Sequence, residues 1–509
     1  MTQDLPDPIR LDQATRRMLW DAVGEAIEAY SRDVGHLSAG GIPDVDEVRK
    51  TLDRFDFERP LPPLEAVSYV IDALRHLQPQ VSHPRHFGLF DPSPTALGVL
   101  GEALAAAFNP CLASWEGSPF GVEAEDFLVR QFAQRFGYPA EAADGIVTSG
   151  GSEANLSALM LALTRRFPQH REDGLGGLAG RPVLYVTREA HPSSRKAALV
   201  AGLGMGSVRE VPTDHMDRMD AAALGEMVDA DVCAGLVPLM VVATVGTTGS
   251  GVVDPIDDVA DVADRRGVWL HADAAWGGAV TLLPELRGEL KGIHRADSIT
   301  FDPHKWLSIP MGCGLLLTRH SGLLDRAFGV GAAFLTGQDG PVLRDQDGPA
   351  PDPYGRSVRW SRNFAGLKLL LSLAVAGWRG YEEALRRQVQ LGQRLRERLA
   401  ADRWALVNDT PLPVVCFVGD PAEHRHARLA LDAMAQAVNA SGQARVFVVR
   451  VGDRFALRAC VTNYATTDAD IDLLVQALSR ARSAVAMGRD TGRMPTSMAE
   501  RGGGCCGAS

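Results

Sequence analysis

Short apolar runs recur through the middle of the chain and alternate with stretches of helical periodicity. The runs are short and rich in β-branched and aliphatic residues, as strands are; they are "GIVTS" (145–149), "VLYVT" (183–187), "SVREV" (207–211), "LMVVAT" (239–244), "VWLHAD" (268–273), "SITF" (298–301) and "GLLLT" (314–318). Helical patterns lie between many of them, at 152–166, 194–203, 220–229 and 256–266. Apolar strands that alternate with helices are typical of a mainly parallel sheet covered on both faces. The pattern therefore predicts an α/β fold with a seven-stranded, mainly parallel sheet in one large domain.

An amphipathic helical pattern precedes this region. Within residues 1–60, several apolar residues fall near one helical face; they are Leu11, Met18, Leu19, Val23, Ala26, Ile27 and Tyr30. A lone amphipathic arm of this kind must bury its apolar stripe against its own core or against a partner subunit. We expect residues 1–100 to form an N-terminal helical arm and residues 101–380 to form the large domain.

The pattern changes again after the last predicted strand. Residues 331–358 are rich in Gly, Pro and Asp, which indicates a long mobile loop, and such loops are often functional. A helical stretch follows, and after it strand-like runs such as "PVVCFVG" and "RVFVVRV" mix with helical patterns. This mixture predicts a small α+β C-terminal domain over residues 381–485. The tail at 486–509 is expected to be disordered.

Composition and charge narrow the class of protein. The chain has 509 residues, of which 46% are hydrophobic and 23% are charged, as in ordinary globular proteins. The net charge of −11, with no block of Lys or Arg, gives no electrostatic reason to expect nucleic acid as a partner. No apolar window reaches the roughly 18 residues that span a bilayer, so we expect no membrane association. Seven scattered cysteines without a CxxC spacing, and a polar start, predict a reduced, cytoplasmic protein.

Two residues at predicted strand ends carry the strongest chemical signal. Lys305 follows the strand in "ADSITFDPHKW", and Asp273 ends the strand in "VWLHADAAWGG". Ligand crevices in open α/β sheets form at the carboxyl ends of strands, so a lysine there is well placed to form a Schiff base with an aldehyde cofactor. A carboxylate at a buried strand end needs a cationic or donor partner, and the pyridine nitrogen of pyridoxal 5′-phosphate (PLP) is such a partner. A surface lysine and a helix-capping aspartate are the simpler interpretations of each residue alone.

Three further strings end predicted strands in the same way. In "TSGGSEANLSAL", Gly151 and Ser152 stand at the start of a helix, where backbone N–H groups and the helix dipole hold a phosphate. His191 in "EAHPSSRK" can stack on a planar ring, and Thr248 in "VATVGTTGSG" can donate to a cofactor. Each string is ambiguous alone, since a glycine-rich turn or a capping hydroxyl needs no ligand. Together they place an amine, an acid, a phosphate cradle and an imidazole at the ends of strands of one sheet.

Two other motifs carry less weight. "GLGMG" (202–206) follows a helix and not a strand, so a glycine helix cap explains it better than a dinucleotide loop. His83 and His86 lie three residues apart, but no cluster of Cys, His and carboxylate residues accompanies them, and we expect no metal site.

With these strings together, the chain resembles the PLP-dependent group II amino-acid decarboxylases, which include aromatic-amino-acid, glutamate and diaminobutyrate decarboxylases. The matching strings are "HPRHFGLF", "SPFGVEAEDFLV", "TSGGSEANLSAL", "VATVGTTGSGVVDP", "WLHADAAWGG", "ADSITFDPHKWL" and "LRACVTNYATTDADIDLL". They run in order from about residue 60 to about residue 485. The resemblance implies the fold type I architecture of PLP enzymes and a homodimer with its active site at the subunit interface.

The resemblance also implies roles for individual residues. Lys305 is the implied Schiff-base lysine, and Asp273 is the implied partner of the pyridine nitrogen. The other implied cofactor contacts are His191 and Ala275 on the two faces of the ring, Gly151 and Ser152 at the phosphate, Thr248 near the cofactor and His304 beside the Schiff base.

This sequence departs from the family pattern at several positions. Asp302 stands where the family often has Asn, and "SRNF" keeps Arg362 but has Asn363 in place of a second Arg. Leu89 and Phe90 stand where aromatic-amino-acid decarboxylases have a Tyr-Phe pair that lines the substrate pocket.

The loop of the family commonly carries a Tyr that protonates the substrate carbon. The candidate here is Tyr354, and Phe334 is a competing match that has no acidic hydroxyl. Together, these observations predict the decarboxylation of an L-amino acid to an amine and CO₂, with the catalytic residues Lys305, His191, Tyr354 and His304. Transamination, aldehyde-forming oxidative deamination and a non-catalytic PLP-fold binding protein are the alternatives.

Overall fold

The computed structural model describes residues 9–330, 348, 350–419 and 428–490. All seven predicted strands form one sheet, in the order β1-β7-β6-β5-β4-β2-β3. Their bounds are β1 (Asp144–Thr148), β2 (Arg181–Thr187), β3 (Val208–Val211), β4 (Leu236–Thr244), β5 (Trp269–Asp273), β6 (Ser298–Phe301) and β7 (Gly314–Thr318). Strand β7 is antiparallel to both of its neighbours, and the other pairs are parallel. The predicted seven-stranded, mainly parallel sheet is therefore confirmed.

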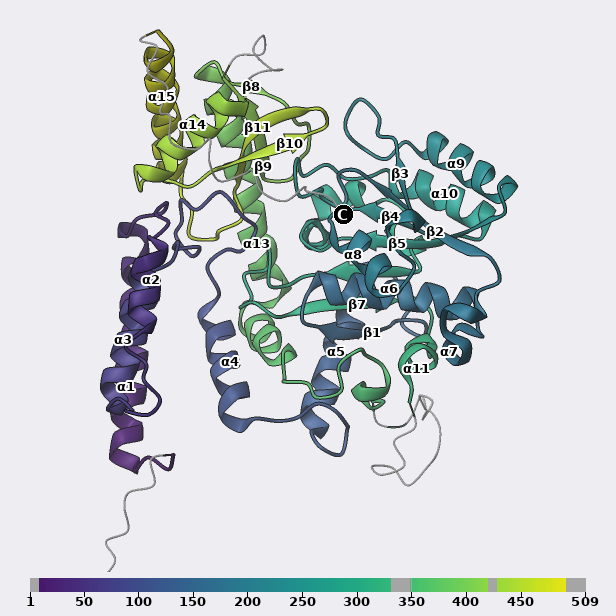
Figure 1. Cartoon of the computed structure of the whole chain (residues 1–509), viewed down its shortest axis with the longest axis horizontal. Helices are drawn as coiled ribbons and strands as arrows, with labels where there is room; N and C mark the ends of the chain where they lie inside the picture. The colour runs from purple at the N-terminus through teal and green to yellow at the C-terminus, as the bar shows by residue number, and fades with distance from the viewer. Residues whose placement is uncertain (1–8, 331–347, 349, 420–427, 491–509) are drawn as a thin grey trace, which may run out of the picture.

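Helices cover both faces of this sheet (Figure 1). One face packs against α6 (Gly151–Arg166), α8 (Ser193–Val200) and α11 (Leu323–Phe328). The other face packs against α5 (Pro119–Arg135), α9 (Ala221–Cys233), α10 (Ile256–Arg266) and the first part of α13 (Gly366–Ala401). Because both faces are covered, strands β1, β5, β6 and β7 are buried along their whole length. Polar side chains can reach a ligand only where these strands end.

A second, smaller core lies at the C-terminal end of the chain. Its sheet has the order β10-β11-β9-β8 and is antiparallel. The strands are β8 (Ala405–Leu406), β9 (Val414–Val418), β10 (Phe447–Val451) and β11 (Arg454–Cys460). Helices α14 (Arg428–Ala440) and α15 (Asp468–Asp490) pack on this sheet together with the second half of α13. This is the α+β C-terminal unit that the sequence predicts.

Two predicted domain boundaries fall inside helices, and one of these helices, α13, is kinked close to the boundary. The boundary at 380/381 lies within α13, which connects the two cores and has non-helical dihedral angles at Gly377 (φ 61°). The boundary at 100/101 lies within α4 (Ala96–Phe108). There a Cβ on Gly101 would lie 2.7 Å from the Cα of Lys368, so α4 packs closely on α13. A helix that passes from one packing environment to another shows no change of composition at the border.

The irregular segments differ from their predicted extents. Residues 331–347 and 349 of the predicted loop, including Phe334, and residues 491–509 of the predicted tail lie outside the described residues. The described end of the loop, 350–358, packs on the large domain, where the buried Arg356 pairs with Asp144 and Asp325. The described part of the predicted loop is thus anchored to the large domain, and its mobility stays a prediction. Helix α15 continues to Asp490, so the predicted tail at 486 begins inside a helix.

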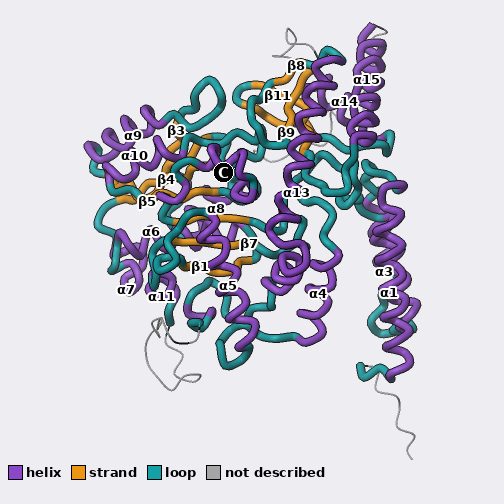
Figure 2. The backbone as a smooth tube through the Cα atoms, turned by 180° about the vertical axis from the view of Figure 1, so that it is seen from behind, coloured by secondary structure: helices purple, strands orange, loops and turns teal. Residues whose placement is uncertain are grey.

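The N-terminal arm stands beside the body of the molecule in both views (Figures 1 and 2). It consists of α1 (Gln13–Asp33), α2 (Val45–Leu52) and α3 (Pro63–His76), and none of these helices contains a buried residue. Helices α1 and α3 pack on each other, yet Trp20 is 60% exposed and Ile27 is 45% exposed. The arm therefore leaves much of its apolar stripe uncovered within one chain.

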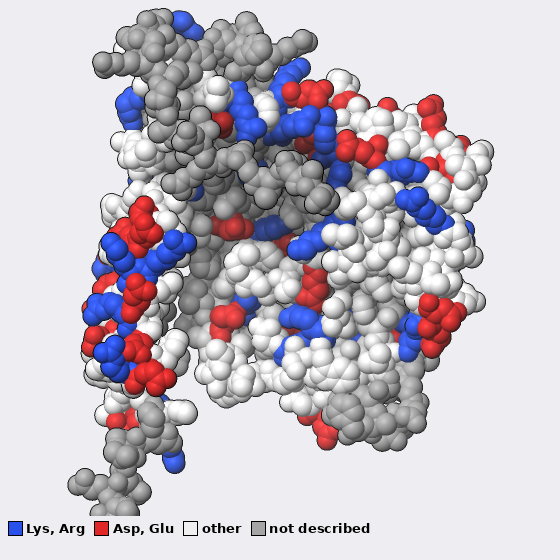
Figure 3. All heavy atoms as spheres, viewed as in Figure 1, with Lys and Arg blue, Asp and Glu red and all other residues white. Residues whose placement is uncertain are grey.

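On the side of the N-terminal arm that Figure 3 shows, charged side chains of one sign do not gather in a large patch. Lys and Arg side chains alternate there with Asp and Glu side chains (Figure 3). Within the described parts of the chain, no helix combines the length and the apolar character that crossing a membrane requires.

Candidate active site

A cavity of about 300 Å³ opens where the parallel strands end, beside the first turn of α6. This volume is at the lower end of the roughly 300–1,000 Å³ of small-molecule and cofactor sites. Its walls come from the segments that follow β1, β2, β4, β5 and β6. Its lining includes eight residues predicted from the sequence, which are Gly151, Ser152, His191, Thr248, Asp273, Ala275, His304 and Lys305. Residues far apart in the chain thus meet in one cavity, as the strand-end argument predicts.

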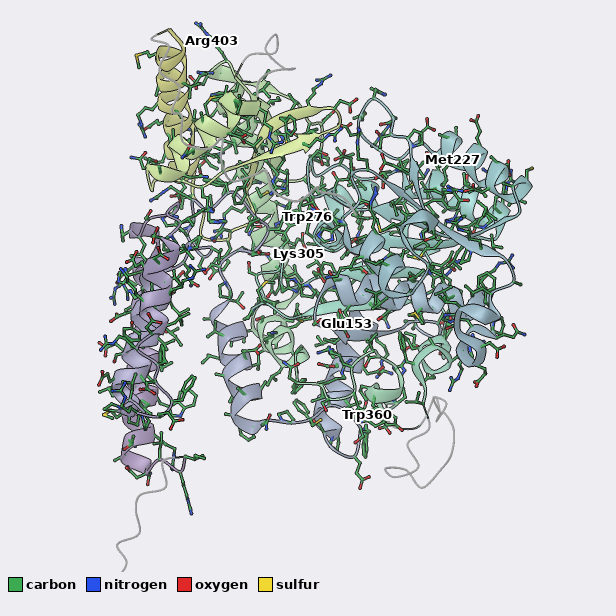
Figure 4. The ribbon with its side chains drawn as sticks, in the orientation of Figure 1. Glu153, Met227, Trp276, Lys305, Trp360 and Arg403 are labelled. Carbon is green, nitrogen blue, oxygen red and sulfur yellow. The ribbon has the colours of Figure 1, made fainter. Side chains whose placement is uncertain are left out.

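Lys305 lies in the turn after β6, near the centre of the molecule and close to Trp276 in Figure 4. Its Nζ is 3.0 Å from Oδ2 of Asp302, which is 1% exposed. Burial lowers the pKa of Lys305, but the carboxylates of Asp302 and Asp273 outweigh this effect and raise the pKa above its ordinary value. Asp302, at the position where the family often has Asn, is therefore the counter-ion of this amine.

Asp273 ends β5 and is 5% exposed. Its Oδ2 accepts a hydrogen bond of 2.9 Å from Nδ2 of Asn155, and its Oδ1 accepts one of 3.2 Å from the backbone N–H of Ala275. The two donors fix the carboxylate at the edge of the cavity. A buried carboxylate with donors on both oxygens can still accept a bond from a cationic ligand group, because each oxygen has a second lone pair.

His191 follows β2 and is exposed at the cavity. Its Nδ1 lies 2.8 Å from Oγ of Ser193 and accepts the backbone N–H of the same residue at 3.2 Å. Partial burial of the ring lowers the pKa of His191 below its ordinary value, although Asp273 acts in the opposite direction. The imidazole is therefore largely neutral at neutral pH.

The turn between β1 and α6 brings backbone to the cavity. Gly150 has φ +152°, and a Cβ there would lie 3.1 Å from Cε1 of His304. A Cβ on Gly151 would lie 2.8 Å from Oδ2 of Asp302. Because α6 begins at Gly151, its first N–H groups have no partner within the helix and can bind an anion. Only glycine fits at these two positions without crowding His304 or Asp302.

The remaining predicted residues around the cofactor site are held by local bonds. Nδ1 of His304 lies 2.8 Å from the carbonyl oxygen of Cys313, which fixes the ring between the turn and Asp302. Thr248 is exposed, and its carbonyl oxygen accepts a bond from Arg458. Both residues line the cavity.

Four predicted positions lie elsewhere. Phe90 is buried and stacks on Trp276 with ring centroids 4.5 Å apart, so it supports a residue of the wall instead of lining the cavity itself. Leu89 is 38% exposed and is not a lining residue, and Asn363 is also exposed. The kept Arg362 is buried, where it pairs with Glu125 at 2.9 Å.

Tyr354 is also placed away from the cavity of its own chain. It is 7% exposed and stacks on Trp360, with ring centroids 4.6 Å apart. Figure 4 shows Trp360 well separated from Lys305. The phenol of Tyr354 is therefore not in position to protonate a group held at Lys305 of the same subunit.

Sequence reasoning missed three contributors. The sequence does not point to Asn155 as a site residue, because a polar residue in a helical pattern normally faces solvent. Asp302 was recognised only as a departure from the family, although its spacing of three residues from Lys305 in a turn is compatible with an ion pair. Trp276 lines the cavity, but apart from being an aromatic residue in "HADAAWGG" nothing in the sequence marks it as a site residue.

The donor set fits pyridoxal 5′-phosphate. The cofactor needs an amine for its aldehyde, an acid for its ring nitrogen and N–H or hydroxyl donors for its phosphate. The cavity offers Lys305, Asp273 and the glycine turn for these three groups. A Cβ on Gly150 or Gly151 would crowd His304 or Asp302, so glycine keeps the backbone N–H groups of this turn open to the cavity.

Comparisons with known proteins agree with this fit. The model of the pyridoxal-dependent decarboxylase conserved domain matches residues 53–419. Tryptophan decarboxylase 1 of Oryza sativa subsp. japonica is 31% identical over 82% of this chain and 83% of its own. Aromatic-L-amino-acid decarboxylase of Bacillus atrophaeus is 28% identical over 87% of this chain and 91% of its own. The crystal structure of Oryza sativa TDC with PLP and tryptamine covers 94% of this chain and 99% of its own, with a TM-score of 0.85 and 26% identity.

The chain therefore belongs to the pyridoxal-dependent decarboxylase family, with the fold type I architecture of that family. It is a PLP-dependent amino-acid decarboxylase, and hence a carbon–carbon lyase. The resemblance seen in the sequence is confirmed.

Proposed function

We propose that the cavity at Lys305 converts an L-amino acid into its amine and CO₂, with Lys305 as the residue that binds the cofactor covalently. The observation that carries this proposal is the meeting of the Lys305 amine, the buried Asp273 carboxylate and the His191 imidazole in one cavity. Bound PLP supplies an aldehyde that forms a Schiff base with an amine and a protonated ring that accepts the electrons left on Cα when CO₂ departs.

The other lining residues would contact different parts of the cofactor. Gly151 and Ser152, at the start of α6, would hold the phosphate. His191 and Ala275 would lie against the ring, and Thr248 and His304 would complete the surroundings of the Schiff-base carbon. Asp273 would keep the ring nitrogen protonated, since a carboxylate beside a pyridinium stabilises its charge.

The reaction exchanges one group on Cα for another. The bond from Cα to the carboxylate breaks, CO₂ leaves and Cα takes up one proton. His191 is the first candidate to deliver this proton, because its imidazole lies at the cavity and its Nδ1 is already engaged with Ser193. Tyr354 stays a weaker hypothesis, since its ring is stacked on Trp360 away from Lys305.

Product analysis tests the proposed reaction. Purified full-length protein with PLP is incubated with each common L-amino acid, aromatic and acidic ones included, and CO₂, amine, aldehyde, ammonia and keto acid are measured. We expect equal amounts of CO₂ and amine. Aldehyde with CO₂, ammonia and hydrogen peroxide, at the expense of O₂, would indicate oxidative deamination, and keto acid without CO₂ would indicate transamination. No turnover with any substrate would favour a binding protein.

We infer further that the protein is a cytoplasmic homodimer. The uncovered apolar stripe of the arm supports the dimer, because residues such as Trp20 and Ile27 have no core of their own chain to cover them. The five described cysteines are free thiols, which suits a reducing compartment.

Sedimentation at micromolar concentration tests the dimer. The double substitution of Trp20 and Ile27 by Glu should shift the protein towards the monomer and reduce turnover. Leu429→Glu is the matched control, because Leu429 is 71% exposed on α14, outside the arm. A wild-type monomer with full activity would contradict the inference.

A further inference from the structure

The side chain of Asn155 uses every hydrogen bond that an amide can make. The residue is 2% exposed in α6. Its Nδ2 donates to Oγ of Ser193 at 2.8 Å and to Oδ2 of Asp273 at 2.9 Å. Its Oδ1 accepts from Oγ1 of Thr300 at 2.6 Å and lies 3.0 Å from Nε2 of His271. An amide has two N–H donors and two acceptor lone pairs, so this set is complete.

The orientation of the Asn155 amide agrees with the hydrogen bonds in the core of the sheet. The indole N–H of Trp269 can only donate, and it donates to Oγ of Ser298 at 2.9 Å. The Ser298 hydroxyl lies 2.8 Å from Nδ1 of His271 and can give that nitrogen its own proton. Burial lowers the pKa of His271 to about 4, so the ring is neutral at neutral pH. With Nδ1 as the acceptor from Ser298, the single proton is on Nε2, which lies 3.0 Å from Oδ1 of Asn155 and 3.2 Å from Oγ1 of Thr300. The reverse orientation of the amide would place N–H against N–H.

The same chain of donors continues to the cavity. Because Oγ of Ser193 accepts from Asn155, its hydroxyl proton goes to Nδ1 of His191. Nδ1 also accepts the backbone N–H of Ser193, so the proton of the neutral His191 ring is on Nε2. Within the described chain no hydrogen bond engages that Nε2, which leaves it for a group in the cavity.

We infer that Asn155 is a positioning residue that holds Asp273 charged and in place and, through Ser193, sets which nitrogen of His191 carries the proton. The inference rests on the proposed roles of Asp273 and His191. Burying a carboxylate is costly unless hydrogen-bond donors compensate for its lost hydration. Asn155 supplies the only side-chain donor that Asp273 has among the described residues.

The test follows the dissociation constant of PLP, measured by equilibrium dialysis of the full-length holoenzyme, as a function of pH, together with kcat/KM. In Asn155→Leu the volume is kept and both donors are lost. Without these donors the buried carboxylate has less compensation for its lost hydration, so the acid limb of both profiles should move to higher pH by about one to two units. Asn155→Asp keeps the acceptor for His271 but sets a second carboxylate beside Asp273, so the limb should move at least as far.

A matched control separates positioning from a general loss of stability. Asn439 also bonds through both ends of its amide, to the backbone of Val446, but lies in the small C-terminal core. Asn439→Leu should leave the acid limb where it is in the wild type. If Asn155→Leu folds and its acid limb stays where it is in the wild type, the inference is overturned. If Asn155→Leu does not fold, the position of the acid limb in Asn155→Asp decides instead.

The parent proposal is tested separately in the same assay. If Asp273→Asn removes the acid limb while Asn155→Leu does not move it, only the inference about Asn155 fails. If the acid limb survives in Asp273→Asn, the role of Asp273 itself fails and the inference about Asn155 fails with it.

Discussion

Asp273 and Asp302 are both buried carboxylates at the ends of neighbouring strands, β5 and β6, yet their surroundings differ. Asp273 has N–H donors on both oxygens, from Asn155 and from the backbone of Ala275. Asp302 has Lys305 at Oδ2, while its Oδ1 has no hydrogen-bond partner among the described residues. One carboxylate is thus held by neutral groups that stay in place, and the other is held by the amine that the reaction uses.

This difference separates two ways of building a reactive site. The bonds of Asp273 are complete without a ligand, so its orientation is set by the fold before any cofactor binds. The bond of Asp302 depends on the charge of Lys305, and this amine would have to give up a proton before it could act as a nucleophile. The wall at β5 is therefore preorganised, whereas the wall at β6 changes its bonding during the reaction.

Removal of Lys305 should have the largest effect, because it takes away both the nucleophile and the partner of Asp302. We expect Lys305→Ala to lose at least about 10³-fold in turnover, within the range that a positioned catalytic group supplies. Borohydride reduction followed by peptide mapping should find no PLP on residue 305. Lys291→Met is the control, since Lys291 pairs with Asp257 and neither residue lines the cavity. A reducible PLP adduct on another lysine, with normal turnover, would show that the assignment is wrong.

Asp273→Asn tests the preorganised wall and should come next. The amide cannot balance a pyridinium charge, so turnover should fall by about 10²–10³-fold, the loss typical of a removed electrostatic contact. The fold should persist, since Asn can still accept the bond from Asn155. Asp297→Asn is the matched control, because Asp297 is a buried carboxylate beside β6 that bonds Leu270 and His320. Equal kcat/KM for Asp273→Asn and the wild type would make Asp273 a structural residue.

Asp302→Asn tests the wall at β6. We expect it to lower turnover less than the two substitutions above, and to show its main effect in the pH dependence of PLP attachment. The carboxylate raises the pKa of Lys305 against the effect of burial. Without it, burial dominates and the pKa of Lys305 falls. In the wild type, the ion pair stabilises the cofactor-free fold at neutral pH and is lost as the pH rises through the raised pKa of Lys305. The rate of PLP attachment, followed by absorbance across pH, should reach its half-maximum at lower pH in Asp302→Asn. A midpoint that stays in place would show that Asp302 does not control this amine.

The positions of the strand-end residues could be predicted from the sequence, because the hydrophobic pattern of a strand and the motif that follows it are both local features. Lys305, Asp273 and Gly151 follow apolar runs, and parallel strands bring their carboxyl ends to one edge of the sheet. Asn155 could not be predicted in its role, because nothing local distinguishes a buried asparagine on a helix from an exposed one. Its four partners come from α8, β5 and β6, so only the assembled sheet shows that they converge. Tyr354 is proposed from the resemblance to the family, whose loop carries a Tyr, and its packing on Trp360 depends on contacts that the resemblance does not contain.

Tyr354→Phe should have the smallest effect. The phenol lies on neither wall of the cavity, and Phe keeps the ring that stacks on Trp360. Burial, with a smaller effect of Asp352, raises the pKa of Tyr354 above its ordinary value, so the group is a weak acid at neutral pH. We expect turnover within about twofold of the wild type, or less than ~0.5 kcal/mol in the activation barrier, and unchanged amine as the product in air. The ratio of amine to aldehyde, measured by chromatography, decides the matter. Aldehyde from Tyr354→Phe alone would show that this hydroxyl reaches Cα, and the proton would then come from a residue outside both walls. An unchanged ratio would leave His191, held by Ser193 and Asn155, as the first residue to replace.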